Sequence, residues 1–315
     1  MEAFRKGNSQ IEFRQSFKSQ SAMEYLMTYG WAILIIAVVL AALFELGVFN
    51  PMTFAPKASP GSCQVVRPDG AGTTNFISLS GECNGELPQY VAQFNGRDGS
   101  TWTASGAIGP NGYDAAYIVL PKVFNPSTMD ALTYTAWIKQ GVWASNGGGG
   151  IIGIGTAGFQ TGYCGTLCFH QCNSGDSGVW FPFTPNGGQW YFVAVALNSS
   201  QTANTLNFYI NNYSASTTTA ELPTNGYSRI GAINCFNYYF NGSIADIQIY
   251  NTALSSNSVR ALYSEGIGGA PIDLQNLAAW YPLDGNAEDY SGNGNNGVPA
   301  NVTYTSNWYS GYGAP

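Results

Sequence analysis

The chain has 315 residues, of which 9% are charged, and its 11 basic and 18 acidic side chains give a net charge of −7. Low charge together with 39 Gly, 20 Tyr, 17 Phe and 8 Trp is typical of many short strands joined by turns. The acidic balance disfavours binding to nucleic acid through phosphate neutralisation, and the charge density is well below that of a cytosolic enzyme.

The first element expected along the chain is a long apolar helix over residues 20–49, before Pro51. Residues 27–44 carry no charge, and about 29 residues of helix reach about 43 Å, more than the roughly 30 Å of hydrocarbon in a bilayer. Glu24 lies inside this helix without a basic side chain nearby, and an unpaired carboxylate in hydrocarbon costs several kcal/mol. Cleavage between Ser19 and Gln20 would create a free amine that neutralises the Glu24 of a neighbouring copy.

The basic leader ending in Lys18 and Ser19, Gln20 at the first mature position and Glu24 at the fifth resemble an archaeal type IV pilin with a class III signal peptide. The resemblance implies that a prepilin peptidase removes residues 1–19 from a membrane-inserted precursor. Residues 20–49 then pack with other copies in the core of an extracellular filament. Ser19 departs from the usual Gly or Ala before the cut. An uncleaved signal anchor is the alternative, and a cut after Gly7 is rejected because a charged segment follows it.

The basic leader places everything after residue 49 outside the cell, and its removal leaves 7 basic and 16 acidic groups, a net charge of about −9. Disulfides persist on that side. Four sequons predict glycosylation of Asn198, Asn212, Asn241 and Asn301. Residues 50–88 are expected to form a proline-rich neck and a hairpin-like loop, with Cys63 and Cys83 at its outer ends and within bridging reach.

From residue 89 onward the pattern is that of an antiparallel β-sandwich. Strands are expected at 90–96, 116–121, 132–140, 150–155, 189–197, 205–212, 228–233 and 243–250. A short helix is expected after Ser255 and before Gly266. Alternation places Leu132, Tyr134, Ala136 and Ile138 on one face of their strand. It places Ala245, Ile247 and Ile249 on the core face of theirs, with Asp246, Gln248 and Tyr250 opposite.

Residues 90–266 resemble a laminin-G-like, concanavalin-A-like jelly roll, because their strand order and the closing run FNGSIADIQIYNTALSSNSVRALYSEG are similar to those of that family. The fold class implied is mainly β, with the long apolar helix in front. Residues 277–297 are similar to the opening piece of such a domain, yet they come last. They begin a truncated second copy or, as we favour, residues 277–315 supply the permuted first strands of one domain spanning residues 89–315.

Two groups of side chains suggest bound metals. Cys164, Cys168, His170 and Cys172 could hold a soft metal, but outside the cell Cys164, Cys168, Cys172 and Cys235 more simply form two disulfides in one of three pairings. Asp98, Asp284 and Asp289 lie in oxygen-rich turns of the kind that bind Ca²⁺. Relatives of laminin-G and pentraxin type often carry one calcium, although Asn- and Gly-rich turns form without it.

No catalytic set is evident. Glucan-hydrolysing jelly rolls use an E-x-D-x-x-E strand, which this chain lacks, and its single histidine provides no Ser-His-Asp set. We therefore expect a non-enzyme, a pilin-like subunit at the cell surface whose head adheres to glycans. The alternatives are a membrane-anchored lectin that never polymerises and a structural filament subunit whose head binds nothing. Loop aromatics suit stacking on sugars, although any one of them more often packs in a core; they are Trp102, Trp143, Phe159, Tyr163 and Trp180.

Overall fold

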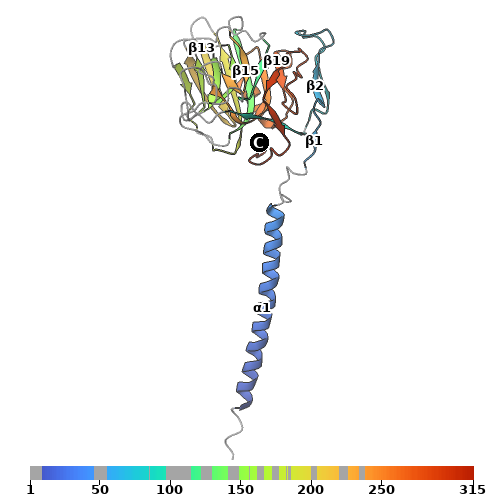
Figure 1. Ribbon diagram of the computed structural model, residues 1–315, viewed down its shortest axis with the longest axis vertical. Coiled ribbons are helices and arrows are strands. Elements are labelled where there is room, and N and C mark those ends of the chain that lie inside the picture. The colour runs from blue at the N-terminus through green and yellow to red at the C-terminus, as the bar shows by residue number, and fades with distance from the viewer. Residues whose placement is uncertain are drawn as a thin grey trace, which may run out of the picture. The chain divides into compact units, whose positions relative to one another are not determined.

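The computed structural model describes residues 9–45, 55–84, 86–96, 115–121, 130–140, 149–155, 157–161, 167–171, 177–181, 183, 186–199, 204–219, 226–233 and 238–315. The chain divides into two compact units, residues 1–55 and 56–315. Among the described residues, the first unit contains helix α1 (Ser9–Glu45), and the second contains the strands and a short helix, α3 (Ser256–Glu265) (Figure 1).

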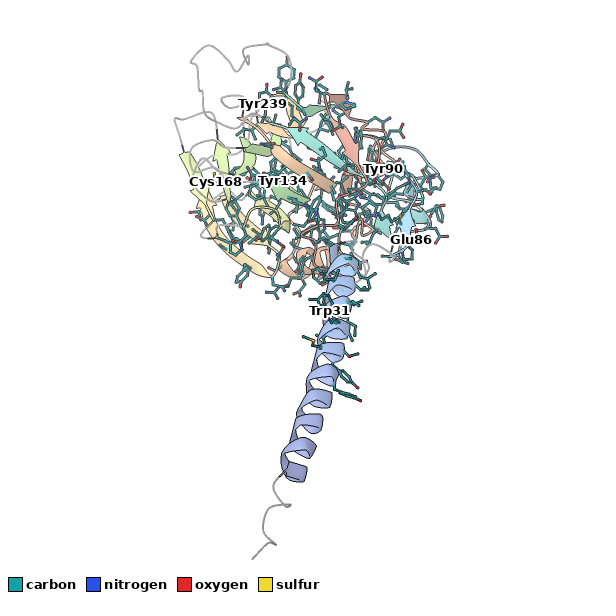
Figure 2. The ribbon with its side chains drawn as sticks, turned by 60° about the horizontal axis from the view of Figure 1, so that its bottom comes forward. Trp31, Glu86, Tyr90, Tyr134, Cys168 and Tyr239 are labelled. Atoms are coloured by element: carbon teal, nitrogen blue, oxygen red, sulfur yellow. A yellow bond between two sulfur atoms is a disulfide. The ribbon has the colours of Figure 1, made fainter. Side chains whose placement is uncertain are left out.

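The N-terminal unit is the helix α1 (Ser9–Glu45), 37 residues long. It begins earlier than expected and continues through the predicted cleavage point between Ser19 and Gln20. Residues 27–44 are long and apolar enough to cross a membrane, and their side chains are exposed on every face of the helix, as Trp31 illustrates (Figure 2). A helix that is apolar all round needs lipid or other helices around it. Its predicted end at Pro51 lies outside the described residues.

The second unit is built on two large antiparallel sheets, which confirms the mainly β sandwich expected from the sequence. One sheet has the order β14-β13-β12-β7-β18-β5-β21, with β19 also paired to β18. The other has the order β11-β10-β9-β8-β15-β6-β20. The bounds are β5 (Val91–Asn95), β6 (Tyr117–Leu120), β7 (Ala131–Gln140), β8 (Gly149–Ile154), β9 (Ala157–Thr161), β10 (Leu167–Gln171), β11 (Ser177–Trp180), β12 (Trp190–Asn198), β13 (Asn204–Ile210), β14 (Tyr213–Thr219), β15 (Ser228–Ile230), β18 (Asn241–Tyr250), β19 (Leu277–Tyr281), β20 (Val298–Ala300) and β21 (Thr303–Thr305).

Three two-stranded sheets accompany the sandwich. They pair β1 (Lys57–Ala58) with β4 (Leu87–Pro88), β2 (Cys63–Val66) with β3 (Ser78–Gly81), and β16 (Ala232–Ile233) with β17 (Tyr238–Tyr239).

The central strand β7 is buried on both faces. The side chains predicted to face the core do so, since Leu132, Tyr134, Ala136 and Ile138 all lie in the apolar layer between the two sheets. The opposite face is covered as well: Trp137 stacks on Tyr263 of the helix α3 (Ser256–Glu265), with ring centroids 5.9 Å apart. A second apolar layer therefore lies on the outer face of this sheet, where the sequence predicted a half-exposed strand.

Helix α3 has the termini expected from its sequence. The Ser255 hydroxyl accepts a hydrogen bond from the Ser258 N–H at 3.1 Å, and Gly266 ends the helix with a φ of 80°. Val259 and Leu262 are its buried side chains. The helix is short, and its packing on the sheet supplies the stability that an isolated ten-residue helix lacks.

A β-bulge in β18 changes the predicted alternation. The pairing with β7 slips by one residue between Ala245 and Gln248, and Asp246 has a φ of 48°. The extra residue turns the strand over. Ile244 and Ile247 therefore both face the layer between the sheets, whereas Ala245 faces the outer layer, contrary to the prediction.

The C-terminal segment completes the sandwich. β19 pairs with β18, β20 with β6 and β21 with β5, so residues 277–305 add strands to both large sheets. A truncated second copy would leave these strands without such partners. Residues 277–305 therefore belong to the same sandwich as the strands before them, and their assignment as the permuted first strands of the family domain stays a prediction.

Residues 56–88, which lie in the neck expected at 50–88, belong to the same compact unit as the head expected at 89–315. Cys63 and Cys83 form a disulfide with a Cα–Cα distance of 4.8 Å. Val65 is buried in the outer apolar layer, and its N–H donates to the Tyr290 carbonyl at 2.9 Å. Apolar burial and a backbone hydrogen bond thus attach the hairpin to the sandwich.

Candidate functional site

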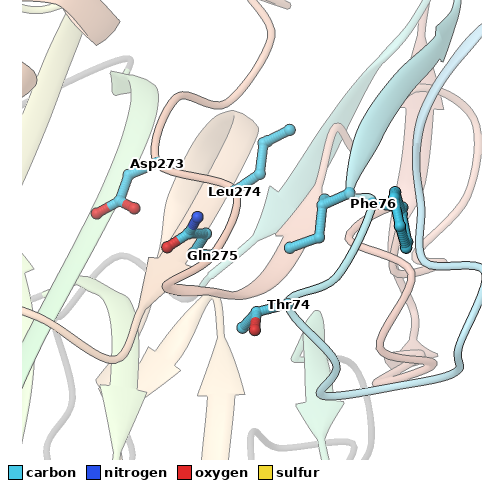
Figure 3. A pocket seen from close by; sticks show the side chains of 6 residues that line it. Thr74, Phe76, Asp273, Leu274 and Gln275 are labelled. Atoms are coloured by element: carbon cyan, nitrogen blue, oxygen red, sulfur yellow. The ribbon is translucent and has the colours of Figure 1, made fainter.

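A groove lies where the N-terminal hairpin, which consists of β2, β3 and the residues between them, meets the loop that precedes β19. It encloses about 590 Å³ and is lined by Thr74, Phe76 and Ile77 on one side and by Asp273, Leu274 and Gln275 on the other (Figure 3). This volume falls in the range of small-ligand sites. Ile77 and Leu274 are half-buried and pack against the outer apolar layer, which supports the floor of the groove.

Arg67 holds the two sides of the groove together. From the hairpin side, its Nη1 donates to the Thr73 carbonyl at 2.6 Å. Across the groove, its Nη2 donates to the carbonyls of Leu274 at 2.7 Å and Leu277 at 3.2 Å, and its Nε donates to the Ser291 carbonyl at 2.9 Å. The guanidinium is buried; desolvation lowers the pKa of Arg67, and the negative charge of Asp289 opposes this shift. One buried cation therefore fixes the spacing of two loops about 200 residues apart.

Phe76 is the unusual residue of the groove. Its side chain is 84% exposed, and its backbone has a φ of 55°. The left-handed region costs a non-glycine residue about 1–2 kcal/mol, and an aromatic ring in water recovers none of this by burial. Phe76 therefore combines backbone strain with an exposed flat apolar face.

Polar groups face the same space. The Asp273 carboxylate accepts hydrogen bonds from Asn276 Nδ2 at 3.1 and 3.0 Å, which orients it and leaves acceptor positions unused. Thr74 and Gln275 are exposed, and their side chains make no hydrogen bond within the described part of the chain. The lining of the groove thus includes a carboxylate, an amide, a hydroxyl and one exposed aromatic ring.

The aspartates predicted to bind calcium have other partners. Asp289 accepts hydrogen bonds from the N–H groups of Trp280, Ser291 and Asn295 and from the Ser291 hydroxyl, at 2.8–2.9 Å. Asp284 accepts from the Tyr90 N–H at 2.6 Å, and burial raises its pKa. Asp98 lies outside the described residues. Across the described ranges, no three His, Cys, Asp or Glu side chains gather as metal ligands, and calcium binding stays a prediction.

The cysteine-rich segment contains a strand that the sequence did not predict. Cys168 and His170 lie on β10, which pairs with β9 and β11. Cys168 is disulfide-bonded. Because Cys63 and Cys83 pair with each other, the Cys168 partner is one of Cys164, Cys172 and Cys235, all outside the described residues.

The loop aromatics predicted as sugar platforms do not form a site in the part of the chain that is described. Phe159 lies on β9 and is buried in the core between the sheets, so its assignment to a loop was wrong. Trp180 lies on β11, and Trp102, Trp143 and Tyr163 lie outside the described residues.

The remaining predicted residues lie on the surface of the head or in the helix. The four sequon asparagines, Asn198, Asn212, Asn241 and Asn301, are exposed. Lys18, Ser19, Gln20 and Glu24 are helical residues of α1, and their side chains fall outside the description. Their roles in processing and assembly stay predictions.

The groove was missed from the sequence for a physical reason. Phe76 falls within the neck and hairpin-like loop expected at 50–88, two residues before β3 begins at Ser78. Neither side of the groove carries a motif, and Arg67 on one side bonds to carbonyls on the other. A long-range contact of this kind leaves no local pattern.

A family model matches part of the second unit. Residues 111–260 match the family model described as the concanavalin A-like lectin/glucanases superfamily. No sequence among curated proteins matches the chain.

Several solved structures are similar to the chain at low sequence identity. A candidate carbohydrate-binding protein from Bacteroides ovatus is 19% identical with a TM-score of 0.48 over 74% of this chain, which spans 64% of that protein's length. The heptameric SAP-like pentraxin of Limulus polyphemus is 14% identical with a TM-score of 0.46, covering 70% of this chain and 95% of the pentraxin. A CBM40 of a Ruminococcus gnavus sialidase, bound to α2,3-sialyllactose, is 14% identical with a TM-score of 0.35, covering 42% and 83%. Over residues 111–260, the second unit of this chain is therefore similar to the concanavalin A-like lectin/glucanases superfamily, and its sheets form the antiparallel sandwich of a jelly roll.

Proposed function

We propose that this protein is a pilin-like subunit of an extracellular filament whose jelly-roll head binds glycans and catalyses no reaction. The observation that carries the proposal is α1, whose residues 27–44 expose apolar side chains on every face. Lipid covers such a helix in the precursor, and the helices of other copies cover it after assembly. Polymerisation therefore moves the same apolar surface from lipid to the helices of other copies, and both environments exclude water.

Glycan binding is supported by the match of residues 111–260 to a lectin-containing superfamily. The groove supports a binding role more than a catalytic one. Its lining contains one carboxylate, Asp273, whereas glycoside hydrolysis commonly uses two on either side of the bond. Calcium near Asp98, Asp284 and Asp289, and glycans on the four exposed sequon asparagines, are parts of the same proposal.

The first test is the mature N-terminus of the surface-exposed protein, read by mass spectrometry. We expect a chain that begins at Gln20, because a prepilin peptidase removes residues 1–19 and keeps the helix. The same spectra report glycans on Asn198, Asn212, Asn241 and Asn301. An intact Met1 would contradict processing and leave the membrane-anchored lectin as the better description.

The second test is Glu24→Ala. In the proposed assembly, the free amine of one copy neutralises the Glu24 carboxylate of its neighbour inside an apolar core, where an unpaired charge costs several kcal/mol. We expect the variant to insert in the membrane normally but to yield few filaments by sedimentation and electron microscopy. The variant Glu24→Gln removes the charge but keeps a polar side chain of the same length, so it separates the effect of charge from that of polarity. Normal filaments from Glu24→Ala would contradict the pairing mechanism, although not filament formation itself.

A further inference from the structure

We propose that the groove beside Phe76 binds a neutral saccharide, with one sugar ring stacked on the Phe76 side chain. The inference rests on the proposed glycan-binding function and assigns it to a place and a ligand class. The groove is formed by residues 74–77 and 273–275, outside the segment that matches the family model. The site is therefore a property of how this chain's hairpin and C-terminal loop meet.

The conformation of Phe76 favours a ligand over a purely structural role. A turn that needs a φ of 55° is served at lower cost by glycine or asparagine. Retaining phenylalanine exposes an apolar ring, and no aromatic partner within the described residues stacks on it. Strain without compensating packing is typical of positions that contact a ligand.

The chemistry of the lining favours a sugar over a protein partner. A sugar ring presents C–H groups on its flat faces and hydroxyls around its rim, so it needs an aromatic platform bordered by hydrogen-bonding groups. Figure 3 shows Phe76 on one side of the groove, with Thr74, Gln275 and Asp273 apart from its ring, so an oligosaccharide with one sugar on Phe76 would reach these acceptors and donors with its other sugars. The groove, at about 590 Å³, has the volume of a small-ligand site.

Charge selects the class of sugar. Asp273 is the charged side chain in the lining, and the whole chain has a net charge of −7. A carboxylated sugar would meet repulsion from Asp273, and the described lining contains no cation to offset it, since the nearby Arg67 donates to four carbonyls. A neutral or amino sugar meets no such penalty.

A second surface provides the comparison. On the outer face of the other large sheet, Arg229 lies over the rings of Tyr117 and Tyr227, at 5.1 and 5.7 Å. Tyr227 is 60% exposed, so it is an exposed aromatic matched to Phe76. A cation held between tyrosines suits a carboxylated sugar, so the ligand class distinguishes the two surfaces.

The experiment is a glycan array with the full chain in detergent, followed by calorimetric titration with the best neutral oligosaccharide. Phe76→Gly is expected to weaken binding on the order of tenfold or more, because the stacking platform is gone. Its melting temperature is expected to equal or exceed that of the wild type, since the glycine relieves the strained backbone. Tyr227→Ala is the matched control and is expected to bind within about twofold of the wild type. Asp273→Asn is expected to admit carboxylated glycans that the wild type rejects.

The outcomes separate this inference from the function on which it rests. Glycan binding that is unchanged in Phe76→Gly but lost in Tyr227→Ala would overturn the assignment to the groove and leave glycan binding intact. A wild-type preference for carboxylated glycans would overturn the ligand class. A wild type that binds no glycan on the array would overturn the glycan-binding function and this inference together.

Discussion

Replacing Asp246 with asparagine is expected to stabilise the head at pH 8 by up to about 4 kcal/mol and to change its stability little near pH 4. Asp246 is buried in the β18 bulge. It accepts a hydrogen bond from Trp280 Nε1 at 2.8 Å and weaker ones from Gln248 Nε2 at 3.2 and 3.4 Å. The Gln248 oxygen in turn accepts from the Tyr250 hydroxyl at 2.6 Å. These donors are neutral, so the carboxylate has no opposite charge as a direct partner among the described residues.

Burial raises the pKa of Asp246 from 3.8 to about 7, and the hydrogen bonds from Trp280 and Gln248 reduce that shift. At pH values between these two pKa values, 3.8 in the unfolded state and about 7 in the folded state, the folded protein keeps a proton that the unfolded protein has lost. Stability therefore falls as pH rises from about 4 to about 7, and it stays at the lower level above that range. Asparagine cannot ionise, it tolerates a φ of 48°, and its oxygen can still accept from Trp280.

The measurement is urea unfolding of residues 56–315, the compact unit that contains the sandwich, at several pH values from 4 to 8. The wild-type and variant curves should diverge as pH rises through that window. Asp69→Asn, which removes an exposed carboxylate, controls for the loss of one negative charge. Parallel pH profiles for the wild type and Asp246→Asn would show that the buried carboxyl does not hold its proton in the folded head.

The sheets and α3 were predictable because local patterns specify them. Alternating apolar residues in β7 mark its inward face correctly, and the Ser255 and Gly266 termini mark the ends of α3. The β18 bulge was not predictable in this way. One extra residue shifts the alternation, and the strand reads as regular in sequence because Ala245 and Ile247 are both apolar.

Contacts between distant segments were the harder part. The outer apolar layer, which buries the second face of β7, combines α3 with the N-terminal hairpin and the C-terminal residues. Trp308 illustrates this, since its Nε1 donates to the Pro88 carbonyl at 3.0 Å across 220 positions. The groove depends on the same meeting of the two ends of the unit. No pattern within a strand-length window reports which ends will meet.

Replacing Arg67 with methionine is expected to lower the free energy of unfolding of residues 56–315 by about 3 kcal/mol or more. Methionine fills much of the volume of the arginine stem but donates no hydrogen bond. The carbonyls of Thr73, Leu274, Leu277 and Ser291 then lose the guanidinium donors that satisfy them. A buried acceptor left without a donor costs about 1–3 kcal/mol.

Arg67→Lys distinguishes geometry from charge, because an ammonium is a point donor and cannot span carbonyls on three separate segments. We expect it to recover less than half of the lost stability. Arg260→Met changes an exposed arginine on α3 and is expected to stay within about 0.5 kcal/mol of the wild type. Chemical unfolding of the four proteins measures these differences directly.

Since Arg67 spaces the two sides of the groove, Arg67→Met should also weaken saccharide binding under conditions where the variant remains folded. Phe76→Gly should weaken binding without lowering stability. Loss of both properties in one variant and of binding alone in the other would separate the residue that builds the groove from the residue that contacts the ligand.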